Sequence, residues 1–443
     1  MYVARTAAPA TRTQAGVWRP NLERWWFAAL IVLCVLFFRT YITVTPWNAR
    51  AHDCIWHLDY IHAIRAQHTI PGPDACPECT QPPAYYVLAE AWLRLATNTA
   101  KADVPTEGHA LQILDAALGV GAAFFFVLTA YAVLRTPYER RIAATLIVFW
   151  PELYVESSKI GNDVLLYFFA AGALSWMVAW RRSLRPRDLI LAALFAGAAA
   201  NAKNNGYVVV VALVGSLLWA IVRAPPGTRR APRGTVRALT TIAASVGFWL
   251  FSVLHWKHGV IHPNWGGPQW PANVTNDLKN FLLPAPGSFF DSPYVKPPYG
   301  NFWEYLFRTS LFGEWGDGNK DLKGYAYEIL VMGLVLCVFL VAGLATLVNR
   351  GFQEKWRGGS LEVLLVLFGF VAFLLCFRTR FPLFFHNDFR FVLPIVAPCA
   401  VLVATGFERF RRRLAPIQPT LASFPVWMVV LFCVLSTQML FRW

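Results

Sequence analysis

The chain contains few charged residues for its length. Only 15% of its 443 residues are Asp, Glu, Lys or Arg, whereas a soluble globular protein has about a quarter. This scarcity, together with a hydrophobic content of 56%, excludes a soluble enzyme and indicates a membrane protein. The sequence also has no convincing internal repeat, so its apolar segments must be assigned one at a time.

Long apolar segments recur from Trp25 to Phe441, and many approach the ~20 residues that a helix needs to cross the hydrocarbon core. Such segments are too long and too uniformly apolar for barrel strands, so we predict helices. About eleven spans are predicted, over residues 25–45, 112–134, 141–156, 163–180, 188–202, 206–222, 238–255, 326–348, 361–377, 391–407 and 423–441. The predicted fold is an all-α integral membrane bundle, with an N-terminal segment over residues 1–24 and a transmembrane domain over residues 25–441.

The formal net charge of +15 does not indicate nucleic-acid binding, because the basic residues cluster in short loops between predicted spans. These loops alternate along the chain and therefore share one side of the membrane, which the positive-inside rule makes cytoplasmic. They lie near residues 135–141, 181–187, 223–237, 350–357 and 409–413. We expect a multi-pass protein of the inner (plasma) membrane, with a cytoplasmic N-terminus and a periplasmic or extracellular C-terminus.

Two long loops, residues 46–111 and 256–325, are predicted on the outer side. The second loop is rich in aromatic residues, including Trp265, Tyr294 and Trp303. These rings form either the aromatic belt that is common at headgroup depth or a lid that stacks on sugar or lipid. We expect the two loops together to form a partly helical cap over an outward-facing cavity.

The first outer loop contains the main candidate for chemistry. Asp53 follows the first span directly, and a carboxylate at that position is unusual. If residues 53–66 form a helix, Asp53 and His57 lie on one face, because they are four positions apart. From these residues alone, a solvated loop with ordinary surface charges is an equally good interpretation.

Four short motifs lie on the predicted outer side, three of them at the ends of predicted spans and one within the first outer loop. They are His52-Asp53 after the first span, Gln81-Pro82-Pro83-Ala84-Tyr85-Tyr86 at the start of a helix, Asn162-Asp163 at the start of an early span, and Arg390-Phe391-Val392-Leu393-Pro394 at the start of a late span. With its number of spans and its loop layout, the sequence resembles the GT-C superfamily of membrane glycosyltransferases over most of its length. It is similar in these motifs to protein O-mannosyltransferases and to the aminoarabinose transferases of lipid A.

The resemblance implies transfer of a sugar from a polyprenyl-phosphate donor to an acceptor hydroxyl at the outer face, with inversion at the anomeric carbon. Asp53 is then the general base, and one base suffices because a phosphate leaves without a strong acid. Cations must hold the departing phosphate, and Arg390 ranks first because it begins a span within a matching motif. The candidate substrate-binding residues are His57, Gln81, Tyr85, Tyr86, Asp163, Lys203, Arg378 and Arg390, with Lys159 and Arg380 as further cations.

The implied partners are a polyprenyl-phosphate-linked sugar, membrane lipid and an acceptor that is a glycan, a lipid or a protein. Two departures from the related families leave the sugar undefined. Gln81 occupies the position of a Lys in the aminoarabinose transferases, and His52-Asp53 that of an Asp-Glu pair in the mannosyltransferases.

Other interpretations of these residues stay open. Asn162 and Asp163 are residue types that cap helices. Cys76 and Cys79 form one CxxC without a second pair, so they are a disulfide, a metal-binding pair or free thiols. The histidines between His52 and His68 lie beside acidic residues, which makes a divalent cation the one candidate cofactor, although their spacing is not a known ligand pattern.

The main alternative function is a transporter or flippase of a lipid-linked or amphipathic solute. Carriers place their binding site near the bilayer midplane. The charged residues of this chain gather instead at the outer ends of the spans, which favours chemistry at the membrane surface. A catalytically silent scaffold that binds polyprenyl lipid is a third hypothesis.

Overall fold

A computed structural model describes residues 20–50, 53–97, 102–223, 239, 241–242, 274–282, 291–294, 301–313, 320–356 and 358–442. Within these ranges every regular element is a helix and no strand occurs, which confirms the predicted all-α fold class. The predicted span 238–255 and most of the predicted outer loop 256–325 lie outside the described residues.

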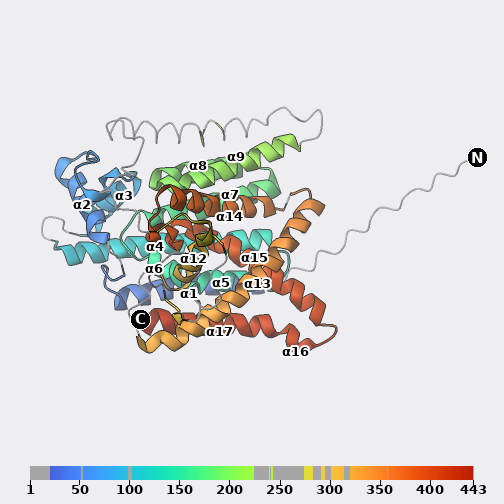
Figure 1. Cartoon of the computed structure of the whole chain (residues 1–443). Coiled ribbons are helices and arrows are strands. Elements are labelled where there is room, and N and C mark those ends of the chain that lie inside the picture. The colour runs from blue at the N-terminus through green and yellow to red at the C-terminus, as the bar shows by residue number, and fades with distance from the viewer. Residues whose placement is uncertain are drawn as a thin grey trace, which may run out of the picture.

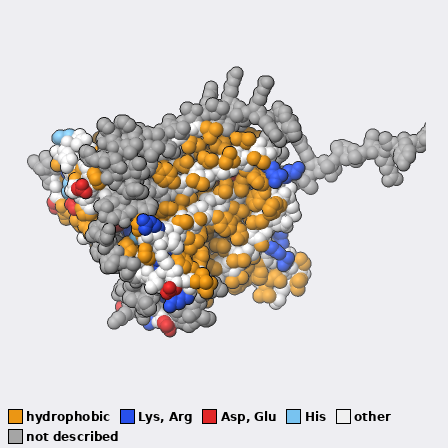
Figure 2. Space-filling model, turned by 45° about the horizontal axis from the view of Figure 1, so that its top comes forward, with side chains coloured by type: hydrophobic (Ala, Val, Ile, Leu, Met, Phe, Trp, Pro, Cys, Tyr) orange, Lys and Arg blue, Asp and Glu red, His pale blue; other side chains and the backbone are white. Residues whose placement is uncertain are grey.

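Eight helices in the described part of the chain are long and apolar enough to cross a membrane. They are Leu22–Val44, Val104–Val133, Asp163–Ser183, Asn204–Val222, Lys323–Gln353, Ser360–Arg380, Phe385–Leu414 and Phe424–Arg442. Each coincides with one predicted span. Figure 2 shows a broad apolar surface with Lys and Arg side chains at its edges, and Val211, Val341 and Trp427 are each more than 60% exposed. The chain is therefore a multi-pass membrane protein.

Figure 1 shows the long helices of the bundle running side by side, with two shorter helices at one end. The bundle helices are α1 (Pro20–Val44), α4 (Val104–Val133), α5 (Pro137–Val148), α6 (Pro151–Glu156), α7 (Asp163–Ser183), α8 (Pro186–Ala202), α9 (Tyr207–Val222), α13 (Lys323–Gln353), α14 (Ser360–Arg380), α15 (Val396–Leu414), α16 (Pro419–Ala422) and α17 (Phe424–Arg442). The short helices at the end of the bundle are α2 (Cys54–Gln67) and α3 (Ala84–Ala96), and α12 (Phe302–Phe312) precedes α13 in the chain. In the bundle, α7 packs against α4 and α8, and α13 packs against α15.

Within the described ranges, six short 3-10 helices connect these elements. They are η1 (Pro77–Thr80), η2 (Asn204–Gly206), η3 (Leu278–Asn280), η4 (Lys320–Leu322), η5 (Phe384–Asn387) and η6 (Phe389–Ile395). The last of them leads directly into α15 and carries the Arg-aromatic motif at the start of the late span.

Two predicted spans correspond to helices that are too short to cross a membrane alone. The span predicted over residues 141–156 is divided into α5, with 12 residues, and α6, with 6 residues. The division falls at Pro151, which lacks the N–H that would continue the helical hydrogen bonds. The span predicted over residues 188–202 is α8, with 17 residues. The predicted number of eleven spans is therefore not established within the described residues.

The first predicted outer loop is partly helical, because α2, η1 and α3 lie within it. It is also shorter than predicted, since α4 begins at Val104 rather than near residue 112. The Asp103 side chain caps α4 there by accepting a hydrogen bond of 3.0 Å from the Thr106 N–H. A disulfide joins Cys76 and Cys79, whose Cα atoms are 5.0 Å apart, in the turn before Gln81. This is one of the three interpretations that the CxxC motif allowed.

Charged side chains hold these short helices on the bundle. Arg65 of α2 bonds through Nε to Glu90 Oε2 of α3 at 3.0 Å and through Nη1 to Glu107 Oε1 of α4 at 2.5 Å. His62 Nε2 lies 2.6 Å from the other oxygen of Glu107. Because both glutamates are buried, their pairing with Arg65 fixes α2 and α3 against the end of α4.

The backbones of α13 and α15 touch where two glycines face each other. A Cβ on Gly343 would lie 1.8 Å from the Leu402 carbonyl oxygen, and a Cβ on Gly406 would lie 2.1 Å from the Phe339 carbonyl oxygen. Small residues at helix crossings allow this close approach in membranes. The contact fixes the position of α15, and thereby of η6, which precedes it.

We expect Gly406→Ala to destabilise the protein by roughly 1–3 kcal/mol, because the added methyl group must push two helix backbones apart. In an unpacked helix the same change would stabilise by up to about 1 kcal/mol, so the sign of the effect is diagnostic. Thermal unfolding in detergent, followed by tryptophan fluorescence, measures it. Gly324→Ala is the matched control, because no atom lies within 4 Å of its added Cβ. Equal unfolding midpoints for the two variants would contradict the close contact.

Candidate active site

Asp53 lies just beyond the end of α1, at the residue that precedes α2. Its backbone occupies the N-cap position of α2, but its side chain makes no capping hydrogen bond. The carboxylate instead lies 3.3 Å from Nη1 of Arg390, which is 337 positions further along the chain. The Asp53 side chain is 19% exposed and that of Arg390 is 10% exposed. The acid predicted to be the base is therefore paired with the cation ranked first for phosphate, and the pair is accessible in part.

Three side chains fix the backbone of η6 around Arg390. The Arg390 N–H donates to Oδ1 of Asp388 at 2.7 Å. The Arg390 carbonyl oxygen accepts from the Tyr167 hydroxyl at 2.8 Å, and the Phe391 carbonyl oxygen accepts from Nδ2 of Asn205, also at 2.8 Å. Elements α7 and η2 thus hold η6 from one side, and Arg390 points towards Asp53.

His57 and Tyr86 flank the Asp53 carboxylate. His57 Nε2 lies 3.8 Å from Oδ2 of Asp53, and His57 Nδ1 lies 2.9 Å from the Tyr86 hydroxyl. Burial raises the pKa of Tyr86, and the nearby Glu78 and Tyr60 raise it further, so the hydroxyl keeps its proton at neutral pH. Tyr86 can then donate to Nδ1, which leaves the ring proton on Nε2, facing Asp53.

A second ion pair joins the start of α7 to the end of α8. Asp163 begins α7, Lys203 follows α8, and Lys203 Nζ lies 2.6 Å from Oδ2 of Asp163. Asn162 occupies the N-cap position of α7 without a capping hydrogen bond from its side chain. Asn162 therefore occupies the capping position without making the capping bond, and the Asp163 side chain is engaged by Lys203.

The ring of Phe391 lies beside both ion pairs. The Arg390 guanidinium carbon is 5.0 Å from the ring centroid, and Lys203 Nζ is 5.3 Å from it. Both distances are short enough for cation–π attraction. The cations of the two carboxylate–cation pairs therefore both lie next to the Phe391 ring. Together the two pairs carry no net formal charge.

The paired-proline motif docks on the Asn-Asp motif. Gln81 Oε1 accepts from Nδ2 of Asn162 at 3.3 Å. The buried Tyr85 hydroxyl donates to Oδ2 of Asp115 at 2.9 Å and accepts from the Gly161 N–H at 3.2 Å. Two predicted motifs that lie far apart in the sequence thus contact each other directly, and Tyr85 serves to join them. A contact of Gln81 or Tyr85 with substrate stays a prediction.

Arg378 has a different environment from the other predicted residues. Its guanidinium donates to Oδ1 of Asn276 at 2.7 Å and to the Thr275 carbonyl oxygen at 3.0 Å, and it lies 5.7 Å from the Phe281 ring centroid. These contacts tie the end of α14 to residues 274–282 of the second outer loop. A phosphate contact by Arg378 stays a prediction.

Four buried acids that were not predicted from the sequence lie near these motifs. Asp388 caps η6 beside Arg390, Asp115 accepts from Tyr85, and Glu156 pairs with Lys159 while Glu152 precedes it by one helical turn. Each belongs to a predicted span or to the start of one, where a carboxylate is costly unless it is paired. Scanning the apolar segments for isolated acids would have found them.

The metal-binding alternatives receive no support from the described residues. No three His, Cys, Asp or Glu side chains among them are arranged to hold a metal ion. His57 contacts Tyr86, His62 contacts Glu107, and Cys76 is bonded to Cys79. His52 lies outside the described residues.

No family model matches the sequence, and no curated protein matches it. Solved structures do match. An oligosaccharyltransferase from Archaeoglobus fulgidus, in complex with Zn and sulfate, aligns with a TM-score of 0.53 at 13% identity, over 93% of this chain and 53% of that chain. The oligosaccharyltransferase AglB from the same organism, in complex with an inhibitory peptide and a dolichol-phosphate, aligns with a TM-score of 0.52 at 12% identity, over 95% and 55% of the two chains.

ArnT from Cupriavidus metallidurans, bound to undecaprenyl phosphate, aligns with a TM-score of 0.49 at 10% identity, over 94% of this chain and 77% of that chain. The chain spans about half the length of the oligosaccharyltransferases it matches. At such low identity the likeness to the oligosaccharyltransferases establishes the fold, and it agrees with the resemblance in the sequence motifs. The chain has the GT-C fold of membrane glycosyltransferases.

Proposed function

We propose that the chain transfers a sugar from a polyprenyl-phosphate donor to an acceptor hydroxyl at the outer face of the membrane, with Asp53 as general base. The pairing of Asp53 with Arg390, at 3.3 Å and beyond the end of α1, carries this proposal. It places a proton acceptor beside a cation that suits a phosphate, where the bundle meets its short helices. The GT-C fold and the lipid phosphate bound to AglB support the same class of reaction.

In this mechanism the acceptor oxygen attacks the anomeric carbon and its proton passes to the Asp53 carboxylate. The bond between the anomeric carbon and the phosphate oxygen breaks on the opposite side, so the configuration inverts. The bonding electrons leave on the phosphate oxygen. A phosphate is stable as an anion, so the departing group needs charge stabilisation rather than a proton from an acid.

Arg390 and Lys203 supply that stabilisation. Each is already paired with a carboxylate, and both lie against the Phe391 ring, so two positive charges are held a short distance apart. Phosphate oxygens compete well for a guanidinium, because its planar donors match them in pairs. When the donor phosphate engages Arg390, Asp53 loses part of its counter-charge and becomes a stronger base.

Asp163 and Asn162 are suited to holding the sugar. Oδ1 of Asp163 and Oδ1 of Asn162 are buried and have no hydrogen-bond partner among the described residues. Buried acceptors that lack a donor are uncommon in folded proteins. Hydroxyl groups of a bound sugar would satisfy both acceptors next to the Asp163–Lys203 pair.

His57 and Tyr86 act as positioning residues. The Tyr86 hydroxyl fixes the imidazole, whose Nε2 faces Asp53 at 3.8 Å. Gly161 allows this arrangement, since a Cβ there would lie 3.2 Å from Nε2 of His57. The tyrosine and the histidine thereby limit the directions in which the carboxylate can point.

A divalent cation stays a hypothesis. One matched oligosaccharyltransferase structure holds Zn, but Asp53 and Asp163 here each have a cationic partner within 3.3 Å. Carboxylates that are already neutralised in this way do not form an anionic metal site. We therefore assign no step of the reaction to a metal ion.

The outer location follows from the basic loops on the opposite side, which predict a cytoplasmic N-terminus. The Cys76–Cys79 disulfide supports it, because disulfides persist in oxidising compartments. The acceptor is a glycan, a lipid or a protein, and the fold alone does not select among these classes.

We expect Asp53→Asn to reduce sugar transfer by about 100-fold to 10,000-fold, because it removes the base. The protein should remain folded, since an amide still fits between Arg390 and His57. The measurement is release of polyprenyl phosphate from polyprenyl-phosphate hexoses by purified protein in nanodiscs. Asp59→Asn is the matched control, an exposed carboxylate on the same helix. Full activity of Asp53→Asn would refute Asp53 as the base.

We expect Arg390→Gln to raise the KM for the donor and to weaken binding of polyprenyl phosphate by about tenfold or more, because one charge-assisted interaction with phosphate is lost. Titration of the purified protein with undecaprenyl phosphate measures this directly. Arg380→Gln is the comparison, because Arg380 is an exposed arginine at the end of α14 that ranks below Arg390 as a phosphate contact. If Arg380→Gln weakens lipid binding and Arg390→Gln does not, the phosphate site lies elsewhere.

A further inference from the structure

A cavity of about 280 Å³ lies at the end of the bundle opposite the candidate active site. Its lining comes from the last turns of α4, α7 and α13 and the first turns of α5 and α14. Since α7 begins at Asp163 in the candidate active site and ends at Ser183, its 21 residues separate the two sites by roughly 30 Å. The cavity therefore plays no direct part in the proposed transfer.

Four arginines line this cavity: Arg135, Arg140, Arg182 and Arg350. Arg140 is buried, and its Nε donates to the Leu134 carbonyl oxygen at 3.0 Å. The Arg350 side chain is 18% exposed. Arg135 and Arg182 are more exposed and lie at the rim. The guanidinium groups thus extend from the surface into the protein.

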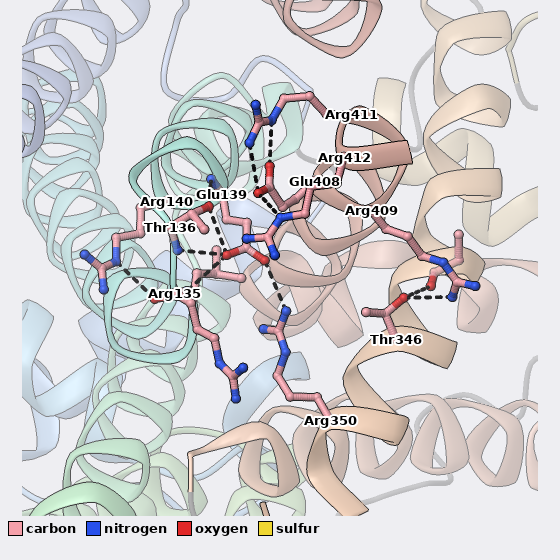
Figure 3. Close-up of polar contacts among 12 residues, drawn as sticks. Arg135, Thr136, Glu139, Arg140, Thr346, Arg350, Glu408, Arg409, Arg411 and Arg412 are labelled. Carbon is pink, nitrogen blue, oxygen red and sulfur yellow. Dashed lines mark hydrogen bonds and ion pairs between the residues drawn. The ribbon is translucent and has the colours of Figure 1, made fainter. Parts of the chain in front are cut away.

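The acidic residues near the cavity do not balance this charge. Glu354 lines the cavity and pairs with Arg135. Glu139 uses Oε2 to cap α5, accepting from the Thr136 N–H at 2.9 Å, and Oε1 is left for Arg350 Nη2 at 3.4 Å. Figure 3 shows Glu139 between the start of α5 and Arg350. Four guanidinium groups against two carboxylates leave a formal excess of two positive charges.

The neighbouring Arg411 and Arg412 also outnumber their one carboxylate partner, but their side chains are 38% and 65% exposed, so water solvates the excess charge. Arg411 and Arg412 both bond to Glu408, with distances of 2.8 Å and 2.6 Å from their Nε atoms (Figure 3). In the cavity, by contrast, Arg350 Nη1 is buried and has no hydrogen-bond partner among the described residues. Although Arg135 pairs with Glu354, burial and the charge of Arg350 lower the pKa of Arg135, which indicates repulsion between the two guanidinium groups. A bound anion would remove this cost.

We propose that the cavity binds the phosphate group of an anionic membrane phospholipid. A guanidinium group can donate two parallel hydrogen bonds to two oxygens of one phosphate. Basic pockets between membrane helices on the cytoplasmic side bind anionic headgroups. The cavity lies at the ends of four candidate membrane spans, which predicts a position at headgroup depth. Leu184 and Phe352 are each 67% exposed and lie two positions from Arg182 and Arg350, where acyl chains can cover them.

The positive-inside rule explains why arginines are frequent on this side, but it does not explain their position around a cavity. Topology requires only positive charge near the ends of the spans. Arg187 and Arg413 satisfy that requirement as exposed side chains on the same side. The buried Arg140 and the half-buried Arg350 are costly arrangements that a topological role does not need.

The test compares wild type, Arg182→Gln/Arg350→Gln, and the matched control Arg187→Gln/Arg413→Gln, which loses the same net charge outside the cavity. Each purified protein is titrated with phosphatidylglycerol or phosphatidylcholine in nonionic detergent and examined by native mass spectrometry and thermal unfolding. Inorganic phosphate and chloride at equal ionic strength form a second arm. We expect the cavity variant to bind phosphatidylglycerol about tenfold more weakly, with phosphatidylcholine unaffected.

Equal phosphatidylglycerol affinity in all three proteins, or an equal loss in both double variants, overturns the proposal. A response to inorganic phosphate alone that requires Arg182 and Arg350 supports the phosphate site and assigns it to a soluble phosphate compound. If the double variant cannot be purified, Arg182→Gln alone still tests the proposal, because its exposed side chain at the rim can be replaced without disturbing the packing.

Discussion

The ion pair between Asp53 and Arg390 joins the start of α2 to η6, which leads into α15. Neither charge is tolerated alone near the membrane, because an unpaired ion in a low-dielectric region costs several kcal/mol. Pairing requires that η6 be held in place by α7, η2 and, through α15, by α13. The candidate active site thus depends on contacts between helices from both halves of the chain.

The cost of an unpaired charge applies at both ends of the bundle, and the two ends meet it in different ways. At the end with α2 and α3, Asp53, Asp163, Arg390 and Lys203 form pairs without net charge, and a phosphate must exchange with carboxylates to enter. At the opposite end the arginines outnumber the carboxylates, and the excess remains around a cavity. The first arrangement suits a transient anionic substrate, whereas the second suits a resident anion.

The motifs are visible in the sequence because each differs from the apolar pattern of its surroundings. Asp53, Asp163, Lys203 and Arg390 are charged residues at the edges of apolar segments, where charge is costly and therefore informative. The acids Asp115, Asp388 and Glu152 carry the same local signal, but they were not predicted because none of them belongs to a recognised motif. The separate environment of Arg378, bonded to Asn276, also could not be read from its position at the end of a span.

The amino-acid sequence by itself determined that this is a helical membrane protein, because hydropathy and segment length are local properties that every residue contributes to independently. It also determined which residues were candidates for chemistry. Only the tertiary structure decided which of them meet. The pairing of Asp53 with Arg390 spans 337 positions, and the position of both cations on Phe391 depends on how α7, α8 and η6 pack. Such contacts arise from the summed packing of many helices, and no local pattern in the sequence encodes them.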